Sequence, residues 1–422
     1  MSYRYRQVSG QLYGRSTLTI RDSLNCIEFS GDNTLVAVGT SESFIRVWSL
    51  ENKPLISPTD PSDHQPSSSR RLIGHSGPVY ALSFSPSIAL PLTSTPQNAT
   101  TNGDTTSTHH NKPITGAPRY LLSSSADTSI RLWDLSAYTN LVVYRSHSAP
   151  VWDVRFSPHG HYFATCSADR TARLWTTSHI APHRLLVGHD ADVDCLAWHP
   201  NSAYLFTAAC SPDRSVRMWD IQRGSAVRLF TGHAGNVTAL AASRDGRLLA
   251  SADDRGDILL WDLAAGRLVK RMRGHARGAG VWSLDWSVES SVLVSAGADG
   301  TVRVWDVRPP STSGAAVSAG ADGKVIGEGG AGTKIDGAGV AVSSGAGSTG
   351  ANGAANAAGA SASTGAAAST ATNGVNGAKK ALSKDVVVSP DQISAFPTKK
   401  SPVYKVRFTQ MNLVVAGGAY LP

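Results

Sequence analysis

Tryptophans recur along the middle of this chain at an almost constant interval, and this feature constrains the fold more than any other. From Trp133 onward the successive spacings are 42, 44, 42 and 44 residues. The tryptophans concerned are Trp133, Trp175, Trp219, Trp261 and Trp305, and Trp48 closes an earlier segment of the same kind. A period of about 40 to 45 residues is typical of a four-stranded propeller blade. We therefore expect an all-β chain built from repeated blades.

The segments between these tryptophans carry the pattern of short antiparallel strands. A unit opens with an alternating strand, as in SHSAPVWDVRFSP, and continues with a second strand such as YFATCS. A tight turn led by Asp follows, and then a third strand such as TARLW. β-Branched and aromatic residues alternate with polar ones at period two, which favours strands that are buried on one face. No long stretch has helical periodicity.

Two dipeptides mark the ends of each unit and connect the repeat to a known family. Gly-His precedes the first strand at Gly74-His75, Gly188-His189, Gly232-His233 and Gly274-His275, and Ser146-His147 stands in the same frame. Asp follows the closing Trp at Asp134, Asp220, Asp262 and Asp306. These features resemble the WD40 repeat, whose blades form closed β-propellers.

The count of units predicts seven blades, the last of them composite. Six complete units end at Trp48, Trp133, Trp175, Trp219, Trp261 and Trp305. A seventh is partial, because only SPVYKVRF (401–408) and LVVAGGAY (413–420) precede the end of the sequence. Closure of the ring removes exposed strand edges. We expect residues 1–20, which alternate in TLTI and in part of SYRYR, to pair with the C-terminal strands and close the last blade.

Two stretches interrupt the period and are predicted to be disordered loops. Residues 87–118 fall between the first and second strands of the second unit, and 309–384 form a Gly/Ala/Ser/Thr tract. Such a tract buries too little apolar surface to offset its ordering entropy. The predicted organisation is blades one to six with the N-terminal closing strand in 1–308, the insert in 309–384, and the last strand of blade six with partial blade seven in 385–422. A linker between two independent domains is the alternative reading of 309–384. The half-blade that follows it argues against that reading.

The four-residue set of His, Ser or Thr, Asp and Trp recurs in one frame of the repeat. Its members are His75, Ser123, Asp127 and Trp133; His147, Thr165, Asp169 and Trp175; and His275, Ser295, Asp299 and Trp305. A hydrolase triad is the competing interpretation, but a nucleophilic site occurs once per fold and needs an oxyanion hole. The resemblance to WD40 propellers implies a structural network instead, in which Asp orients His, His reaches the hydroxyl, and the hydroxyl reaches the indole N–H.

Three units depart from this frame. The fourth, FTAACSPDRSVRMW, has two extra residues between Thr207 and Asp213, and the fifth, ASADDRGDILLW, is read with one extra residue before Trp261. The first has Val38 and Glu42 at the hydroxyl and Asp positions. We expect incomplete networks in these three blades. Arginines two residues before the closing Trp are read as blade-building, at Arg46, Arg131, Arg173, Arg217 and Arg303.

In this fold the position after the first apolar residue of strand one faces the rim or mouth of the channel. It holds Asn25, Tyr80, Trp152, Asp194, Thr238, Trp282 and Tyr404. Tyr and Trp dominate interface energetics, so the candidate partner-binding rim consists of Tyr80, Trp152, Asp194, Trp282 and Tyr404. The alternative is that these side chains only cap the inner strands and fill the channel.

Other functional chemistry is not indicated. The chain has no GxxxxGK[ST] phosphate loop, no HExxH helix and no zinc-like spacing of its four cysteines, so no cofactor, metal or catalytic residue is predicted. The N-terminus lacks the apolar run of a signal peptide, and no window is long and apolar enough to span a membrane. The net charge of +8 permits contact with acidic partners, but its spread along the chain predicts no DNA-binding patch.

Three runs carry a closer resemblance. PVWDVRFSPHGHYFATCSADRTARLW, DVDCLAWHPNSAYLFTA and DRSVRMWDIQRGSAVRLFTGH resemble consecutive blades of the WD40-bearing TBP-associated factor of TFIID, which fungi also use in the SAGA coactivator. The resemblance covers nearly all of 21–308 and 391–422. It implies a nuclear, non-enzymatic scaffold that holds histone-fold TBP-associated factors, with no small-molecule substrate, no membrane and no direct DNA contact.

That family also carries a LisH motif and a helical dimerisation region before the propeller, and this sequence shows neither. We expect a fragment, a propeller-only paralogue or a truncated gene model. The alternative function is that of a WD40 adaptor of another complex, such as the substrate receptor of a ubiquitin ligase. Such an adaptor would present peptide-reading residues on one face and a partner-binding box outside the propeller.

Overall fold

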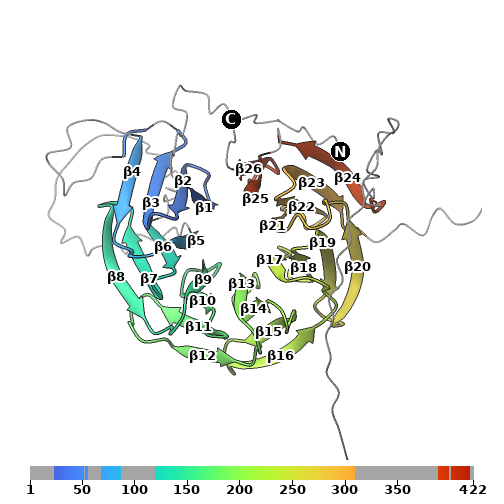
Figure 1. The fold of residues 1–422 in the computed structure, drawn as a ribbon, viewed down its shortest axis with the longest axis horizontal. Helices are drawn as coiled ribbons and strands as arrows, with labels where there is room; N and C mark the ends of the chain where they lie inside the picture. Colours follow the sequence, from blue (N-terminus) through green and yellow to red (C-terminus); the bar gives the residue numbers. More distant parts are fainter. Residues whose placement is uncertain are drawn as a thin grey trace, which may run out of the picture. The chain divides into compact units, whose positions relative to one another are not determined.

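The computed structural model describes residues 23–51, 53–55, 68–86, 119–308, 388–398 and 401–418. These residues form strands and turns without a helix, which confirms the all-β prediction. Six sheets have four strands each, and one sheet has two (Figure 1). None of the described residues belongs to a membrane-spanning helix.

Consecutive strands make up each of the first three sheets. Their bounds are β1 (Leu24–Phe29), β2 (Leu35–Thr40), β3 (Phe44–Ser49) and β4 (Ser69–Ile73); β5 (Val79–Phe84), β6 (Tyr120–Ser125), β7 (Ser129–Asp134) and β8 (Thr139–Arg145); and β9 (Val151–Phe156), β10 (Tyr162–Ser167), β11 (Thr171–Thr176) and β12 (Arg184–Val187).

The remaining sheets continue in chain order. Their bounds are β13 (Val193–Trp198), β14 (Tyr204–Ala209), β15 (Val216–Asp220) and β16 (Ser225–Phe230); β17 (Val237–Ala242), β18 (Leu248–Asp253), β19 (Asp257–Asp262) and β20 (Arg267–Arg273); β21 (Val281–Trp286), β22 (Val292–Gly297), β23 (Thr301–Asp306) and β24 (Gln392–Pro397); and the two-stranded β25 (Val403–Phe408) and β26 (Val414–Gly418).

The first strand of each sheet lies on the inside, beside the first strand of the next sheet. β1 packs beside β5, β5 beside β9, β9 beside β13, β13 beside β17, β17 beside β21, and β21 beside β25 (Figure 1). β25 in turn packs beside β1, so the series of inner strands closes on itself. This is a β-propeller with six four-stranded blades.

The seventh blade is not confirmed. β25 and β26 pair only with each other in the described chain, and residues 1–20, which we expected to complete them, lie outside the described residues. The predicted inserts 87–118 and 309–384 also lie outside them. After the second of these segments the chain returns to the sixth sheet, where β24 pairs antiparallel with β23.

Apolar clusters fill the space between neighbouring sheets. One joins Ala81, Leu122 and Tyr144 of the second sheet to residues of the third sheet that include Phe163 and Trp175. Another joins Val294 and Val304 of the sixth sheet to β25. A smaller one joins Phe29 and Trp48 of the first sheet to Val415 of β26. Burial of each such side chain contributes about 1.5–3 kcal/mol, so the alternating residues of the strands hold the sheets face to face.

Candidate functional site

The recurring polar set forms a hydrogen-bonded network inside its blade. In the third sheet, His147 Nδ1 lies 2.7 Å from Asp169 Oδ2, and His147 Nε2 lies 2.8 Å from Thr165 Oγ1. The indole N–H of Trp175 donates to the same hydroxyl at 2.9 Å. This pattern is satisfied if Thr165 donates to a neutral histidine that carries its proton on Nδ1. Equivalent bonds join His75, Ser123, Asp127 and Trp133, and join His275, Ser295, Asp299 and Trp305.

Electrostatics favour a neutral histidine and an ionised aspartate in this network. Burial lowers the pKa of His147, against the opposing effect of Asp169. Burial by itself would raise the pKa of Asp169, but hydrogen bonds from His147 and Thr171 outweigh it and hold that pKa well below its usual range. A buried network in which each member is paired stiffens the blade.

The expectation of incomplete networks is wrong for the fourth and fifth blades. His189 contacts Asp213 at 2.7 Å and Thr207 at 2.8 Å, and Trp219 donates to that hydroxyl at 2.7 Å. The two extra residues form a turn closed by the bond from Arg214 N to Cys210 O, so Asp213 still reaches the histidine.

The fifth blade reaches the same result by another route. His233 contacts Asp253 at 3.1 Å and Ser251 at 2.6 Å, and Trp261 donates to Ser251 at 2.8 Å. Ser251 and Trp261 are ten residues apart, as Ser123 and Trp133 are, so there is no extra residue. The aspartate of this network is Asp253, at the end of β18. The other blades have a different residue type at that strand position.

In the first blade, Val38 occupies the position that a serine or threonine hydroxyl holds in the other networks. Val38 is buried and packs with Trp48 in the cluster shared with β26. The guanidinium of Arg46 lies 5.9 Å from the centre of the Trp48 ring. The arginines at the same position of two other blades, Arg131 and Arg217, also lie inside their own blade. Each lies beside the glycine of the Gly-His pair, since a Cβ added to Gly74 or Gly188 would lie within 3.0 Å of it. The glycine of the Gly-His pair leaves room for that arginine.

All seven rim positions line one central cavity of about 570 Å³. Each is the extra residue of a β-bulge, where the ladder to the second strand skips one residue, as between Val79 and Ala81 around Tyr80. A bulge re-aims a side chain, and here it turns one residue of every inner strand toward the same opening. We call this set the mouth ring: Asn25, Tyr80, Trp152, Asp194, Thr238, Trp282 and Tyr404.

The aromatic residues of the mouth ring lie in two pairs. The ring centres of Tyr80 and Trp152 are 4.7 Å apart, and those of Trp282 and Tyr404 are 5.0 Å apart. Trp282 is 38% exposed, which is high for a tryptophan on an inner strand. Asp194 stands on β13, the inner strand beside the β9 that carries Trp152, and burial together with Asp192 raises its pKa to about 6.

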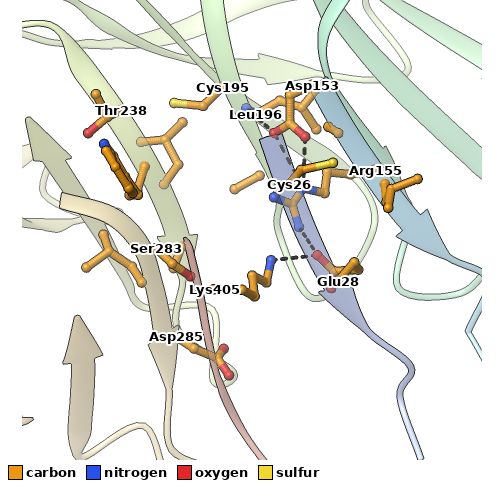
Figure 2. A pocket seen from close by; sticks show the side chains of 18 of the residues that line it. Cys26, Glu28, Asp153, Arg155, Cys195, Leu196, Thr238, Ser283, Asp285 and Lys405 are labelled. Carbon is orange, nitrogen blue, oxygen red and sulfur yellow. Dashed lines mark hydrogen bonds and ion pairs between the residues drawn. The ribbon is translucent and has the colours of Figure 1, made fainter. Parts of the chain in front are cut away.

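Deeper in the cavity lies a cluster of charged residues that the sequence reasoning missed. Glu28 Oε2 on β1 lies 2.7 Å from Lys405 Nζ on β25 and 3.3 Å from Arg155 on β9. Figure 2 shows Glu28 and Lys405 pointing toward each other, with Arg155 beside them. Burial would raise the pKa of Glu28, but the cations Lys405, Arg155 and Arg407 lower it overall. Glu28 and Arg155 stand four residues after the start of their strands, and Lys405 stands two after the start of its strand. This spacing could have indicated that all three share the strand face of the first residue, but not that their charges pair.

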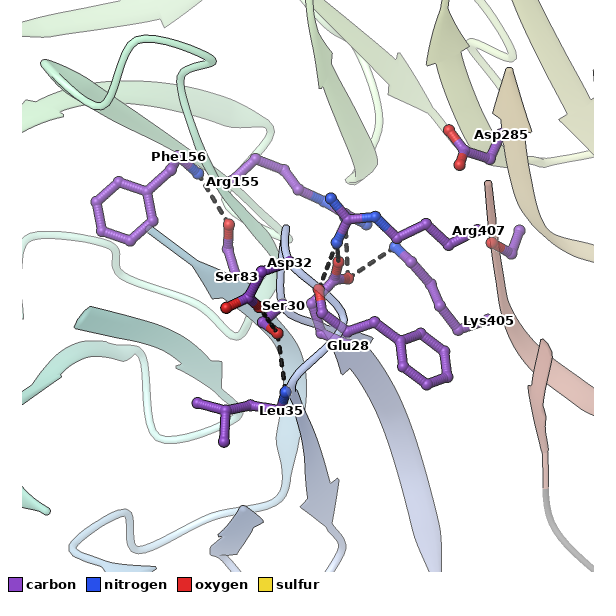
Figure 3. Close-up of polar contacts among 12 residues, drawn as sticks. Glu28, Ser30, Asp32, Leu35, Ser83, Arg155, Phe156, Asp285, Lys405 and Arg407 are labelled. Carbon is purple, nitrogen blue, oxygen red and sulfur yellow. Dashed lines mark hydrogen bonds and ion pairs between the residues drawn. The ribbon is translucent and has the colours of Figure 1, made fainter. Parts of the chain in front are cut away.

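Side chains of the inner strands also bond to the backbone of the next inner strand. Ser83 on β5 accepts from Phe156 N at 3.0 Å (Figure 3), and Asp153 on β9 accepts from Leu196 N at 3.2 Å. Asp285 on β21 accepts from Phe408 N of β25 at 2.6 Å, and Arg407 on β25 donates to the carbonyl of Phe29 on β1. These bonds join β25 to both of its neighbours.

Metal-ligating side chains do not gather into groups of three or more in the described part of the chain. The four cysteines, Cys26, Cys166, Cys195 and Cys210, are free thiols. Burial raises the pKa of Cys26 to about 12 and raises that of Cys195 well above the usual value. These two thiols are therefore protonated, packing groups of the cavity wall.

Comparison with known proteins gives consistent matches. The family model described as "WD domain, G-beta repeat" matches residues 14–49, 103–134, 138–176, 181–220, 224–262 and 266–306, more than half of the chain. The chain is 30% identical over 262 residues to "Transcription initiation factor TFIID subunit 5" of Caenorhabditis elegans, covering 57% of this chain and 35% of that protein.

Two further relatives show the range of the similarity. The "SAGA complex/transcription factor TFIID complex subunit Taf5" of Schizosaccharomyces pombe is 40% identical over 123 residues, 29% of this chain and 14% of that protein. "Nuclear distribution protein nudF" of Aspergillus niger is 27% identical over 292 residues, 68% of this chain and 60% of that protein. The chain thus covers less than two thirds of each relative's length. The six matched repeats show that it belongs to the WD40-repeat family, with homology to the TFIID subunit 5/Taf5 proteins of several species.

Proposed function

We propose that this protein is a non-enzymatic scaffold subunit of a nuclear transcription initiation or coactivator complex of the TFIID or SAGA kind. The observation that carries the proposal is the similarity of its repeats to TFIID subunit 5/Taf5 proteins from four organisms or more. The role in this complex is to hold other TBP-associated factors, above all the histone-fold subunits. Repeated buried networks and a stiff ring suit a part that presents surfaces and does not change shape.

The proposed contact surface is the rim formed by Tyr80, Trp152, Asp194, Trp282 and Tyr404. Aromatic side chains on a rigid scaffold lose little conformational entropy when a partner covers them, which makes them effective anchors. Their pairing across neighbouring strands holds each ring in place before a partner arrives.

The test is affinity purification of the tagged full chain from its own cells. Recovery of histone-fold and TBP-associated subunits is the expected result, and recovery of a cullin adaptor in their place would overturn it. The rim is tested with the double variant W152A/W282A, which should recover several-fold less of these subunits. A matched control removes two exposed apolar side chains of the outer strands, V187A/L229A, and should leave recovery unchanged.

We also propose that β25 and β26 are the inner strands of a seventh blade, completed by residues 1–20, and that 309–384 is an insert in the sixth blade. Support comes from the contacts of β25 with both β21 and β1. Deletion of residues 1–20 should lower the melting temperature and speed hydrogen exchange in β26. Deletion of residues 330–349, equal in length, should do neither. Equal behaviour of the two deletions would contradict this organisation.

A further inference from the structure

The mouth ring holds a single charged residue, and that charge has no partner in the described chain. Asp194 is its only ionisable group with a charge at neutral pH, and no lysine, arginine or histidine of the described chain forms an ion pair with it. The charges deeper in the cavity are different, because Glu28 pairs with Lys405 and Arg155 (Figure 2), and Arg155 pairs with Asp153 as well. The opening of the channel is therefore locally negative, while these deeper charges have partners.

Asp194 is also partly withdrawn from water, which makes its lack of a counter-charge costly. Burial is the main cause that raises its pKa, and the carboxylate of Asp192 adds to it. A carboxylate in this state gains from an incoming cation more than an exposed one does, because a lower effective dielectric strengthens the attraction.

The neighbours of Asp194 provide a second feature that suits a cation. Trp152 and Tyr80 lie in contact on one side of the mouth, and Trp282 with Tyr404 lies on the other. The faces of such rings carry negative charge density and attract cations within about 6 Å of the ring centre. A planar guanidinium can stack on an indole and still give two hydrogen bonds to one carboxylate.

Trp152 differs in its hydrogen bonding from other tryptophans of the inner strands. Its Nε1–H is buried and has no hydrogen-bond acceptor in the described chain. The indoles of Trp198 and Trp286, in contrast, donate to backbone carbonyls of neighbouring strands at 3.1 and 3.0 Å. The Trp152 ring is therefore positioned by contacts such as that with Tyr80 and not by a hydrogen bond of its indole.

We propose that the mouth ring is a binding site for a cationic side chain, preferably arginine, carried by a segment of a partner protein. The guanidinium would pair with Asp194 and stack on Trp152 or Trp282. This inference rests on the proposed role of the rim as a contact surface and names the chemistry of what enters it. The chain's overall charge of +8 does not oppose it, because charges beyond about 8 Å are screened at physiological salt.

The site can be tested without knowledge of the partner. The probes are the peptide Ac-Gly-Ala-Arg-Ala-Gly-NH2 and its counterpart with citrulline, which keeps the shape of arginine and loses the charge. The full chain is labelled with 5-fluorotryptophan, and the resonances of Trp152 and Trp282 are assigned from W152F and W282F. The arginine peptide should shift one or both resonances saturably, with an affinity at least tenfold above that of the citrulline peptide.

The variant D194N should lower the affinity for the arginine peptide about tenfold and abolish the preference over citrulline. D190N removes an exposed carboxylate from the loop before β13, changes the net charge equally, and should have no effect. Equal binding of both peptides to the wild type would overturn the site even if D194N failed to fold. So would unchanged binding to D194N, or tighter binding of a peptide with aspartate at the central position. If D194N loses the peptide but still recovers histone-fold subunits, the cation site stands and the rim is not the surface that holds them.

Discussion

Glu28 Oε2 on the first inner strand lies 2.7 Å from Nζ of Lys405 on β25, near the other end of the chain. The two residues stand on adjacent strands at the place where the ring of inner strands closes (Figure 3). Arg155 reaches the same carboxylate from β9, which is separated from β1 by β5. One buried carboxylate thus links three inner strands.

Replacement of Glu28 by Gln is expected to destabilise the protein by about 3–5 kcal/mol, because it leaves the buried Lys405 without its counter-charge and leaves Arg155 with Asp153 alone. Glu51→Gln is the matched control, since Glu51 pairs with Lys53 on the surface. Surface pairs contribute about 0–1 kcal/mol. Urea unfolding at neutral pH measures the free energy of unfolding of both variants. Equal losses would show that the ion pairs of Glu28 do not stabilise the closure of the ring.

Thr165→Val keeps the shape of the side chain and removes the hydroxyl that joins His147 to Trp175. Two buried polar groups lose their partner, so we expect a loss of about 2–4 kcal/mol in the free energy of unfolding. Thr139→Val, at an exposed position of β8, should change stability by about 0.5 kcal/mol or less. A loss in Thr165→Val no larger than that of the control would mean that the network is not stabilising.

Gly74→Ala is expected to destabilise the second blade by about 1–3 kcal/mol, because overpacking displaces tightly held groups. The added methyl group would lie 2.7 Å from Arg131 Nη1 and 3.1 Å from the Trp133 ring. Gly31→Ala is the control, since its nearest neighbour would be 4.0 Å away. Thermal unfolding compares the two, and a neutral Gly74→Ala would mean that Arg131 can move at little cost.

The raised pKa of Asp194 predicts how stability depends on pH. In the folded protein this pKa is about 6, against 3.8 for an unperturbed aspartate, so the folded state holds the proton more tightly. The stabilisation that comes from this tighter proton binding is complete below the pKa that Asp194 has in the unfolded state. It is lost as the pH rises through the pKa of the folded state. At pH 7.5 Asp194→Asn should therefore be more stable than the wild type by about 1 kcal/mol, a value reduced for partial solvent exposure.

The comparison is made by urea unfolding at pH 7.5 and pH 4, with Asp190→Asn as the control. The advantage of Asp194→Asn should disappear at the lower pH, where the wild-type carboxyl is protonated. An advantage of the same size at both pH values would show that packing, and not ionisation, is its cause.

The repeat in the sequence was enough to predict the six four-stranded blades, and the resemblance to WD40 propellers implied which strand positions face the mouth. Tryptophans at a constant period and strands of period two describe interactions within one blade, and such local interactions recur wherever the motif recurs. The contacts of Asp213 and Asp253 could not be predicted from such a pattern, since turns of different length can bring an aspartate to the equivalent histidine of each blade. Counting residues cannot reveal which turn the backbone adopts.

Relations between blades were decided by the tertiary structure alone. Glu28, Arg155 and Lys405 belong to three different repeats, and no local pattern shows that their side chains meet in one cavity. No local pattern shows either that Asp194 lacks a counter-charge, because this depends on which charges the other inner strands bring near it. The sequence by itself determined the blade and the residue that each inner strand turns toward the mouth. Closure of the ring decided which charges of the inner strands are paired, as at Glu28 and Lys405, and which are not, as at Asp194, because charge pairing depends on distance in space and not on distance along the chain.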